Sequence, residues 1–346
     1  MFLALREIKK EKLRYGLIIT MIVMITYLLF ILLGLMNGLS NENTAALKSW
    51  DTRTVWLNKN ANDRLSQSTL MANQVPKHMA LIGDVPGQLK RTQGAAHKQD
   101  VQLVGLKNHD FIAQKKIQLV SGHWLRNDCQ LVLDESLRQQ GYHLGTKVSF
   151  NGNKQLKVVG FARDAKLNIA PIAYTTLSQW QKLHGGPFVG SALISDKASH
   201  HHYAGMRRYG IKQFINKLPG YTAQNTTFEM MIGFLLVISL VVIAVFLYIL
   251  TMQKTKQYAL LRAQGIPSEK LVGATIAQSL ILIISGVVIA VVLTGITIKA
   301  LPAGVPVLMD PHQLSWMVLA ILGIGLLSSC LPTAMIMRID PLDALK

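Results

Sequence analysis

Residues 17–37, LIITMIVMITYLLFILLGLMN, form an apolar run without a single charged side chain. As an α-helix rising about 1.5 Å per residue, this run reaches roughly 31 Å, which matches the hydrocarbon core of a bilayer. A secretory signal peptide would have a shorter run followed by a small-residue cleavage site, and no such site follows here. The residues before the run include five basic ones, Arg6, Lys9, Lys10, Lys12 and Arg14. Residues 17–37 therefore predict an uncleaved first transmembrane helix with a cytoplasmic N-terminus.

Three more apolar segments follow, at residues 229–252, 273–298 and 314–337. The connection over 253–272 contains Lys254, Lys256, Arg262 and Lys270 against the single acid Glu269. Short loops rich in Lys and Arg stay in the cytoplasm, so this connection and the C-terminus at 338–346 are expected there. Residues 299–313 then form a short outer loop, and residues 38–228 form a large extracytoplasmic domain. The expected fold is a membrane all-α protein of four helices, with this domain inserted between helices 1 and 2.

The inserted domain is strongly basic. The whole chain has a net charge of +18, and residues 38–227 hold 24 Lys and Arg against 11 Asp and Glu, a net charge of +13. Long domains cross the membrane largely regardless of charge, so this surplus does not contradict the topology. A solubilising surface is one explanation for this positive charge. For a domain outside the cell, the charge suits membrane lipid headgroups, cell-wall polymers or an acidic substrate better than nucleic acid.

Strand-like segments within the inserted domain predict an α+β fold. Val, Leu and aromatic residues bracketed by Gly, Asn or Asp mark strands at 52–59, 101–107, 130–133, 147–150 and 155–161. The pair Asn151-Gly152 predicts a two-residue hairpin. Short helices are expected at 134–141 and 205–217. The polar stretch 60–100 is expected to be weakly structured, and the run His200–His202 to be an exposed loop rather than a metal site.

The chain contains no phosphate-binding loop of the G-x-x-x-x-G-K-[ST] type, no H-E-x-x-H and no G-x-S-x-G. It is therefore not expected to be an enzyme, and the apolar segments lack the mid-span ionisable groups of an ion relay. A partner ATPase is the better source of energy. Residues 254–271, KTKQYALLRAQGIPSEKL, predict a helix ended by a left-handed Gly265, with Pro267 in the first turn of the next helix. This helix-turn-helix is either a docking element or an ordinary loop. In the first span, Gly34-x-x-x-Gly38 indicates close helix packing.

Four regions resemble the permease subunits of ABC transporters of the MacB/FtsX superfamily: ALREIKKEKLRYG near the N-terminus, residues 119–164, KQYALLRAQGIPSEKL, and the ending RIDPLDALK. The resemblance implies a cytoplasmic amphipathic helix over 1–16 and a coupling loop that contacts an ABC ATPase subunit. The implied coupling residues are Gln257, Leu260, Leu261, Arg262, Ala263, Gly265 and Pro267, where Gln257 replaces a Glu that is frequent in the family.

Within the superfamily the chain looks closest to heme-exporter permeases of Gram-positive bacteria, through FLALREIKKEKLRYGLI, SWDTRTVWLNK and PGYTAQNTTFEMMIGF. This branch implies a homodimer with two ATPases, motion passed from the cytoplasmic side to the outer domains, and substrate entering from the membrane. Heme would be the transported substrate rather than a resident cofactor. Side chains that suit heme iron are Tyr221, Glu229, Met230, Met231 and Met36. Each has a simpler alternative, because interfacial Tyr usually anchors a helix and Met usually packs.

Two other functions remain open at the level of the sequence. With the same architecture the substrate could be an antimicrobial peptide or a hydrophobic drug. A different class is a non-transporting mechanical regulator of a cell-wall enzyme, which needs little substrate-lining chemistry at the mouths of the spans. The grouping of Met, Glu and Tyr near residue 229 favours transport.

Overall fold

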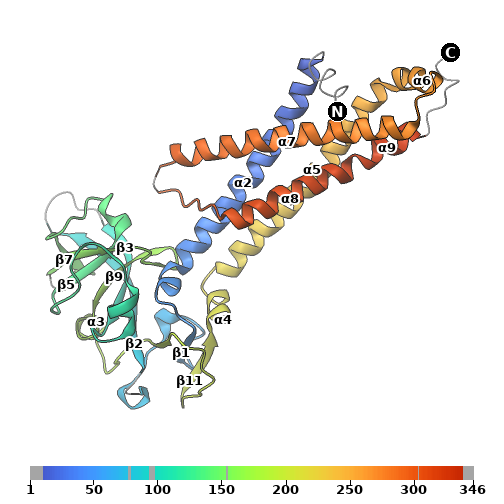
Figure 1. Cartoon of the computed structure of the whole chain (residues 1–346). Helices are drawn as coiled ribbons and strands as arrows, with labels where there is room; N and C mark the ends of the chain where they lie inside the picture. The colour runs from blue at the N-terminus through green and yellow to red at the C-terminus, as the bar shows by residue number, and fades with distance from the viewer. Residues whose placement is uncertain (1–10, 77–78, 93–97, 153–154, 303, 338–346) are drawn as a thin grey trace. The chain divides into compact units, whose positions relative to one another are not determined.

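Figure 1 shows the computed structural model, which describes residues 11–76, 79–92, 98–152, 155–302 and 304–337. The chain divides into two compact units. The membrane unit comprises Met1–Gly38 and Asn225–Lys346, and the inserted domain comprises Leu39–Gln224. Most of the expected N-terminal amphipathic helix, and the expected C-terminal signature at 338–346, lie outside the described residues.

The membrane unit is built from long apolar helices, four of which are long and apolar enough to cross a membrane. This confirms the four predicted spans, although the helices are longer than the apolar segments. The helices are α2 (Lys12–Ser49), α5 (Tyr221–Gln253), α6 (Thr255–Ala263), α7 (Ser268–Ala300), α8 (Pro311–Ser328) and α9 (Cys330–Met337). The fourth span, predicted as one helix, is interrupted at Ser329. Pro332 explains this break because it has no N–H to donate to the carbonyl four residues earlier.

Helices α2 and α7 touch at three points that follow the same order along both. Tyr15 meets Gln278, the missing side chain of Gly286 leaves room for Ile22, and the Tyr27 hydroxyl lies 3.1 Å from Thr297 Oγ1. A Cβ on Gly286 would come within 2.6 Å of Ile22 Cγ2. The sequence of contacts shows that both helices cross the unit in the same general direction, as the predicted topology requires.

The Gly34-x-x-x-Gly38 motif packs against a loop instead of a helix. The Leu308 N–H donates to the Gly34 carbonyl at 3.0 Å, and a Cβ on Gly38 would overlap the backbone carbonyl of Pro306. The prediction of close helix packing is therefore wrong in its partner: the segment that approaches the two glycines is the extended one before α8. Backbone meets backbone here, which only glycine permits.

The inserted domain contains a large mixed sheet, ordered β11-β1-β10-β2-β3-β9-β5-β7-β4, with β6 beside β2 and β7 and with β8 beside β9. Neighbouring strands are antiparallel except for the parallel pairs β3–β9 and β5–β7. The strands are β1 (Thr54–Asn58), β2 (Ala80–Arg91), β3 (Lys98–Leu106), β4 (Leu119–Gly122), β5 (Gln130–Asp134), β6 (Lys147–Phe150), β7 (Gln155–Ala162), β8 (Lys166–Leu167), β9 (Ala170–Thr176), β10 (Ala192–Ser195) and β11 (Met206–Gly210). The short helices are α3 (Leu177–His184) and α4 (Ile211–Asn216), with single turns at Leu65–Gln67, Ala72–Gln74, Ile112–Lys116 and Glu135–Arg138.

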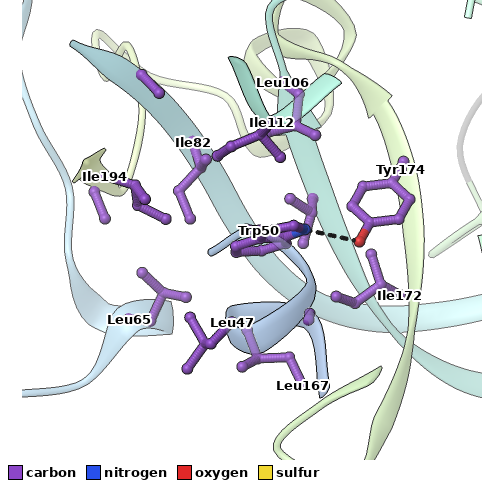
Figure 2. Close-up of a cluster of buried hydrophobic side chains, with 14 of the residues drawn as sticks. Leu47, Trp50, Leu65, Ile82, Leu106, Ile112, Leu167, Ile172, Tyr174 and Ile194 are labelled. Carbon is purple, nitrogen blue, oxygen red and sulfur yellow. Dashed lines mark hydrogen bonds between the residues drawn. The ribbon is translucent and has the colours of Figure 1, made fainter. Parts of the chain in front are cut away.

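Two apolar clusters form the core of the inserted domain. In the first, the C-terminal turn of α2 inserts Trp50, whose indole N–H donates to the Tyr174 hydroxyl at 3.1 Å (Figure 2). In the second, Trp180 of α3 lies over Gly83 and Gly105, where any Cβ would overlap its ring. Two glycines on neighbouring strands thus make the recess that holds α3 against the sheet.

Several sequence predictions for the inserted domain need correction. Residues 80–91, expected to be weakly structured, form the long strand β2, which pairs with β3, β10 and β6. The expected helix at 205–217 is strand β11 followed by the shorter α4, because residues 206–210 complete the edge of the sheet beside β1. The β6–β7 hairpin exists, but Ser149 pairs with Gln155, so its connection is longer than two residues. The five predicted strands are confirmed, and so is the exposure of His200–His202.

Candidate functional site

The helix-turn-helix predicted at 254–271 is present as α6, a tight turn and α7. Gly265 has a φ of 85° and donates to the Arg262 carbonyl at 3.0 Å, while the Ile266 N–H donates to the Leu261 carbonyl at 3.1 Å. This pair of bonds is the Schellman motif, which satisfies the last carbonyls of a helix. Pro267 directly precedes α7 instead of lying in its first turn, and Glu269 in that turn complements the helix dipole.

Most of the predicted coupling residues are exposed on this element. Gln257, Leu260 and Ala263 on α6 are exposed, as are Gly265 and Pro267 in the turn, whereas Leu261 and Arg262 are half-buried. Beneath the turn is a cavity of about 400 Å³, lined mainly by apolar side chains of α6, the turn and α7. Leu260 is a large apolar residue with 56% of its surface exposed. Leu260 lies in the last turn of α6, so its exposed apolar side chain is presented beside the capped turn.

Next to this surface lies a buried polar cluster that the sequence did not reveal. Lys254 occupies the break between α5 and α6 and is only 5% exposed. Its ammonium donates to the Tyr15 hydroxyl at 2.7 Å and lies 3.5 Å from Gln278 Oε1, while the Gln278 amide also donates to the Tyr15 oxygen. The sequence identifies Lys254 only as one of the basic residues in the connection between two spans. Gln278, with Thr275 and Ser279 nearby on α7, was the available signal of a polar face within a span.

The residues expected to hold heme iron fall in both compact units of the chain. Tyr221, the first residue of α5, belongs to the inserted domain, where its hydroxyl lies 2.9 Å from Ser40 Oγ and its ring packs against the core. Met36 is half-buried and packs against the buried cluster of the membrane unit. Glu229, Met230 and Met231 are exposed on α5, the two Met by 56% and 43%.

Glu229 stands at one end of an exposed apolar face of α5. Phe234, Val237 and Val241 continue this face at helical spacing from Met230, and each is more than half exposed. Gly233, one turn after Glu229, has no atom within 4 Å of where a Cβ would lie. Within the described residues Glu229 makes no ion pair. The face therefore presents an apolar surface with a carboxylate and two thioethers at its end.

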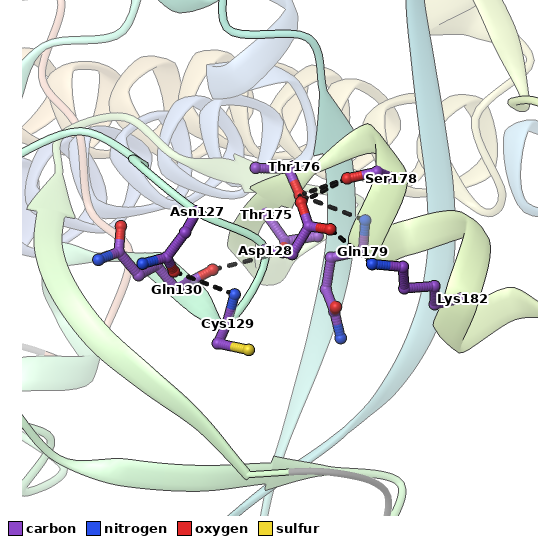
Figure 3. Close-up of polar contacts among 9 residues, drawn as sticks. All are labelled: Asn127, Asp128, Cys129, Gln130, Thr175, Thr176, Ser178, Gln179 and Lys182. Atoms are coloured by element: carbon purple, nitrogen blue, oxygen red, sulfur yellow. Dashed lines mark hydrogen bonds and ion pairs between the residues drawn. The ribbon is translucent and has the colours of Figure 1, made fainter.

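The inserted domain has a wide polar cavity of about 450 Å³ at the ends of β3 and β9. Asp128 is the centre of the hydrogen-bond network on one side (Figure 3). It accepts from the Thr176 hydroxyl at 2.7 Å, from the Ser178 hydroxyl, and from the Lys182 ammonium at 2.6 Å. These donors, Lys182 foremost, lower the pKa of Asp128 to about 2. The carboxylate is thus held charged and fixes the first turn of α3.

Buried carboxyl groups in the inserted domain behave in the opposite way. Asp84 on β2 is fully enclosed, accepts from the Gln102 amide at 2.7 Å, and its other carboxylate oxygen has no partner within the described structure. Desolvation raises the pKa of Asp84 to about 7. Among the described residues no group of three or more His, Cys, Asp or Glu side chains is placed to hold a metal ion.

Comparison with known proteins finds similar permeases. Residues 229–341 match the model of the FtsX-like permease C-terminal domain. Relatives from two strains of Staphylococcus epidermidis are each 26% identical over 352 residues, which cover 100% of this chain and 99% of the relative. A relative from Staphylococcus haemolyticus is 24% identical over 350 residues with the same coverage. All three bear the provisional name hemin transport system permease protein HrtB.

Two solved structures were found to be similar to parts of the chain. The periplasmic region of MacB from Actinobacillus actinomycetemcomitans is 19% identical and covers 48% of this chain and 92% of that region, with a TM-score of 0.35. The extracellular domain of the noncanonic ABC-type transporter YknZ from Gram-positive bacteria is 11% identical and covers 41% and 82%, with a TM-score of 0.32. The resemblance to FtsX-like permeases is confirmed by the family model and the full-length relatives.

Proposed function

We propose that this chain, whose residues 229–341 match the FtsX-like permease C-terminal model, is the ABC-type membrane subunit of an efflux system that exports heme and is driven by a separate ATPase. The similarity along the whole chain to proteins named as hemin transport permeases supports the substrate. The absence of a phosphate-binding loop from the sequence supports a partner that hydrolyses ATP.

The observation that carries this proposal is the α6–α7 element with its hydrogen-bonded turn at Gly265. Its four basic residues against one acid put it on the cytoplasmic side by the positive-inside rule. The inserted domain and the loop before α8 are then extracytoplasmic, and both chain ends are cytoplasmic. A capped turn with an exposed Leu260 is a surface that an ATPase subunit can grip and move.

Heme fits the exposed face of α5 by its chemistry. Heme is a flat apolar ring with two carboxylates and an iron that accepts Glu, Met or Tyr ligands. The apolar face would receive the ring, and Glu229, Met230 or Met231 would offer the iron ligand. In a homodimer two such faces would enclose a groove that opens to membrane lipid. ATP-driven movement of α6 would then pass through the helices to the extracytoplasmic domains and release the substrate.

A titration of the purified permease–ATPase complex with heme tests both parts of the proposal. We expect co-purification of the ATPase and a saturable shift of the Soret band. Glu229→Gln should alter that spectrum or weaken binding, whereas Glu269→Gln, a matched loss of a carboxylate in the first turn of α7, should leave the spectrum unchanged. A complex without a saturable shift would exclude heme, and stimulation of ATP hydrolysis by peptides or drugs would then favour a different cargo. If no cargo stimulates hydrolysis, the regulator function gains support.

A further inference from the structure

The cluster of Lys254, Tyr15 and Gln278 joins three separate elements of the membrane unit. Tyr15 comes from α2, Lys254 from the break between α5 and α6, and Gln278 from α7. All three side chains are buried, Tyr15 completely. The Lys254 ammonium also lies 5.5 Å from the centre of the Tyr15 ring. The sequence positions of Lys254 and Tyr15 are 239 apart, so this contact exists only through the tertiary fold.

Burying these polar side chains lowers the stability of the fold unless their hydrogen bonds compensate for the lost hydration. Taking an ammonium out of water into an apolar unit is strongly unfavourable unless hydrogen bonds compensate for its lost hydration. An ammonium has three donors, and here a phenol oxygen and an amide oxygen accept from it. A Leu or Met at position 254 would fill this place between α5 and α6 without that cost. A lysine at position 254 therefore indicates a directional, hydrogen-bonded link between the helices and not simple packing.

The link connects the docking element to α2, a helix that continues into the inserted domain. Helix α6 begins directly after Lys254, and the Tyr258 N–H donates to the Lys254 carbonyl at 2.9 Å. Helix α2 starts at Lys12, passes Tyr15 and runs without interruption to Ser49. A rotation of α6 must therefore either carry Tyr15 with it or break the bonds of Lys254.

We propose that Lys254, Tyr15 and Gln278 are positioning residues that couple the docking helix α6 to α2. The proposal deepens the function proposed above, since it assumes that an ATPase moves α6. Its structural part, the fixed placement of α6 against α2, does not depend on the identity of the cargo or on the ATPase.

The first experiment measures the placement of α6 in the full-length permease in lipid nanodiscs. With Cys129 and Cys330 replaced by Ser, spin labels at Leu13→Cys on α2 and Lys256→Cys on α6 report the distance between these two helices by pulsed electron paramagnetic resonance, in samples mixed with excess unlabelled permease so that a dimer carries at most one labelled copy. Both labelled positions are exposed and make no part of the cluster. We expect a single narrow distance distribution, which Tyr15→Phe broadens. The phenylalanine keeps the ring and removes only the oxygen that accepts both bonds.

The matched control is Tyr27→Phe, which removes a hydroxyl from the same helix where it meets Thr297 of α7. It should leave the distribution narrow. Lys254→Met, which keeps an unbranched side chain but removes the ammonium, should broaden the distribution as Tyr15→Phe does. The double variant should resemble either single one, because each interrupts the same link. Unchanged distributions in both single variants would overturn the proposal, and so would equal broadening by Tyr27→Phe.

The second experiment measures cargo released per ATP hydrolysed in proteoliposomes that contain the ATPase. Tyr15→Phe should retain ATPase binding and hydrolysis but lower the ratio about tenfold, an uncoupling that general misfolding would not produce. A parallel loss of release and hydrolysis would overturn the coupling role. If the unmodified permease binds no ATPase, the proposed function fails, while the spin-label distances still decide whether the cluster fixes α6.

Discussion

The left-handed turn at Gly265 offers the most direct test of the docking surface. Its φ of 85° lies in a region that residues with a Cβ adopt only at a cost of about 1–2 kcal/mol. A Cβ at this position would have no atom within 4 Å, so Gly265→Ala introduces backbone strain without a steric clash. The strain must either persist in the turn or be relieved by opening the bonds from Gly265 and Ile266 to the end of α6.

We expect Gly265→Ala to weaken ATPase binding by about fivefold to thirtyfold, the factor that 1–2 kcal/mol represents at 25 °C when the strain opposes the bound conformation. The assay is equilibrium binding of the purified ATPase to the permease in nanodiscs, by biolayer interferometry. The heme spectrum of the permease should not change, since α6 is not part of the proposed heme-binding face.

Gly273→Ala is the matched control for this measurement. Gly273 lies within α7, also has no atom within 4 Å of a Cβ, and has ordinary helical geometry. Alanine is favoured over glycine in a helix by about 1 kcal/mol, so this change should leave binding equal or slightly stronger. Equal affinities for the two variants would refute the reasoning that the turn geometry presents the docking surface.

Three further predictions concern stability. Because the pKa of Asp84 is raised to about 7 by burial, the folded state keeps a proton that the unfolded chain loses near pH 4, so stability falls as pH rises from 4 to 7. At about 1.4 kcal/mol per pKa unit, the protonated Asp84 accounts for a decrease of up to about 4 kcal/mol in the free energy of unfolding between pH 4 and pH 7. Asp84→Asn should remove this decrease, as measured by tryptophan fluorescence during thermal unfolding. Gly38→Ala should destabilise the membrane unit by several kcal/mol, because the new Cβ would overlap the backbone of Pro306; detergent-resistance assays measure this. Asp63, whose pKa is lowered to about 2 chiefly by Lys217, stabilises the fold above pH 4 and loses this effect as pH falls towards 2. Asp63→Asn should therefore cost about 1 kcal/mol at neutral pH, measured by the same fluorescence.

Each of these has a result that would contradict it. A stability–pH curve with the same slope in the Asp84 variant would show that other groups cause the slope. The matched control for Gly38→Ala is Gly233→Ala, since Gly233 lies on an exposed part of α5 with open space around it. Equal losses of stability in the two variants would exclude the close contact with Pro306 as the cause. For Asp63, a variant as stable as the unmodified chain at neutral pH would show that its ion pairs contribute nothing.

The sequence predicted what depends on local pattern. Apolar length marked the four spans, and Gly265 marked the turn because only backbone conformation requires a glycine there. It failed where long-range pairing decides. Strand β2 has the composition ALIGDVPGQLKR, in which Gly, Pro and charged residues outnumber the alternating apolar ones. Pairing with β3 on one side and with β10 and β6 on the other makes it a strand. The cluster of Lys254, Tyr15 and Gln278 was not predicted for the same reason, since no pattern within these three segments indicates that their side chains meet.

The candidate heme ligands show a second limit of prediction from sequence. A ligand set can be shared between two copies of the chain, and one sequence does not show which residues of the two copies meet. Met36 packs against the buried cluster of the membrane unit, while Met230 and Met231 are exposed on α5. An iron ligand set that combines them would need either a rearrangement that turns Met36 out of its packing or a second copy of α5. The second requirement is simpler, because the exposed face is already apolar and Glu229 ends it without an ion pair in the described structure. If heme binds this face, dimer formation and heme affinity should be linked, so that dilution to monomers weakens binding even when Glu229 is intact.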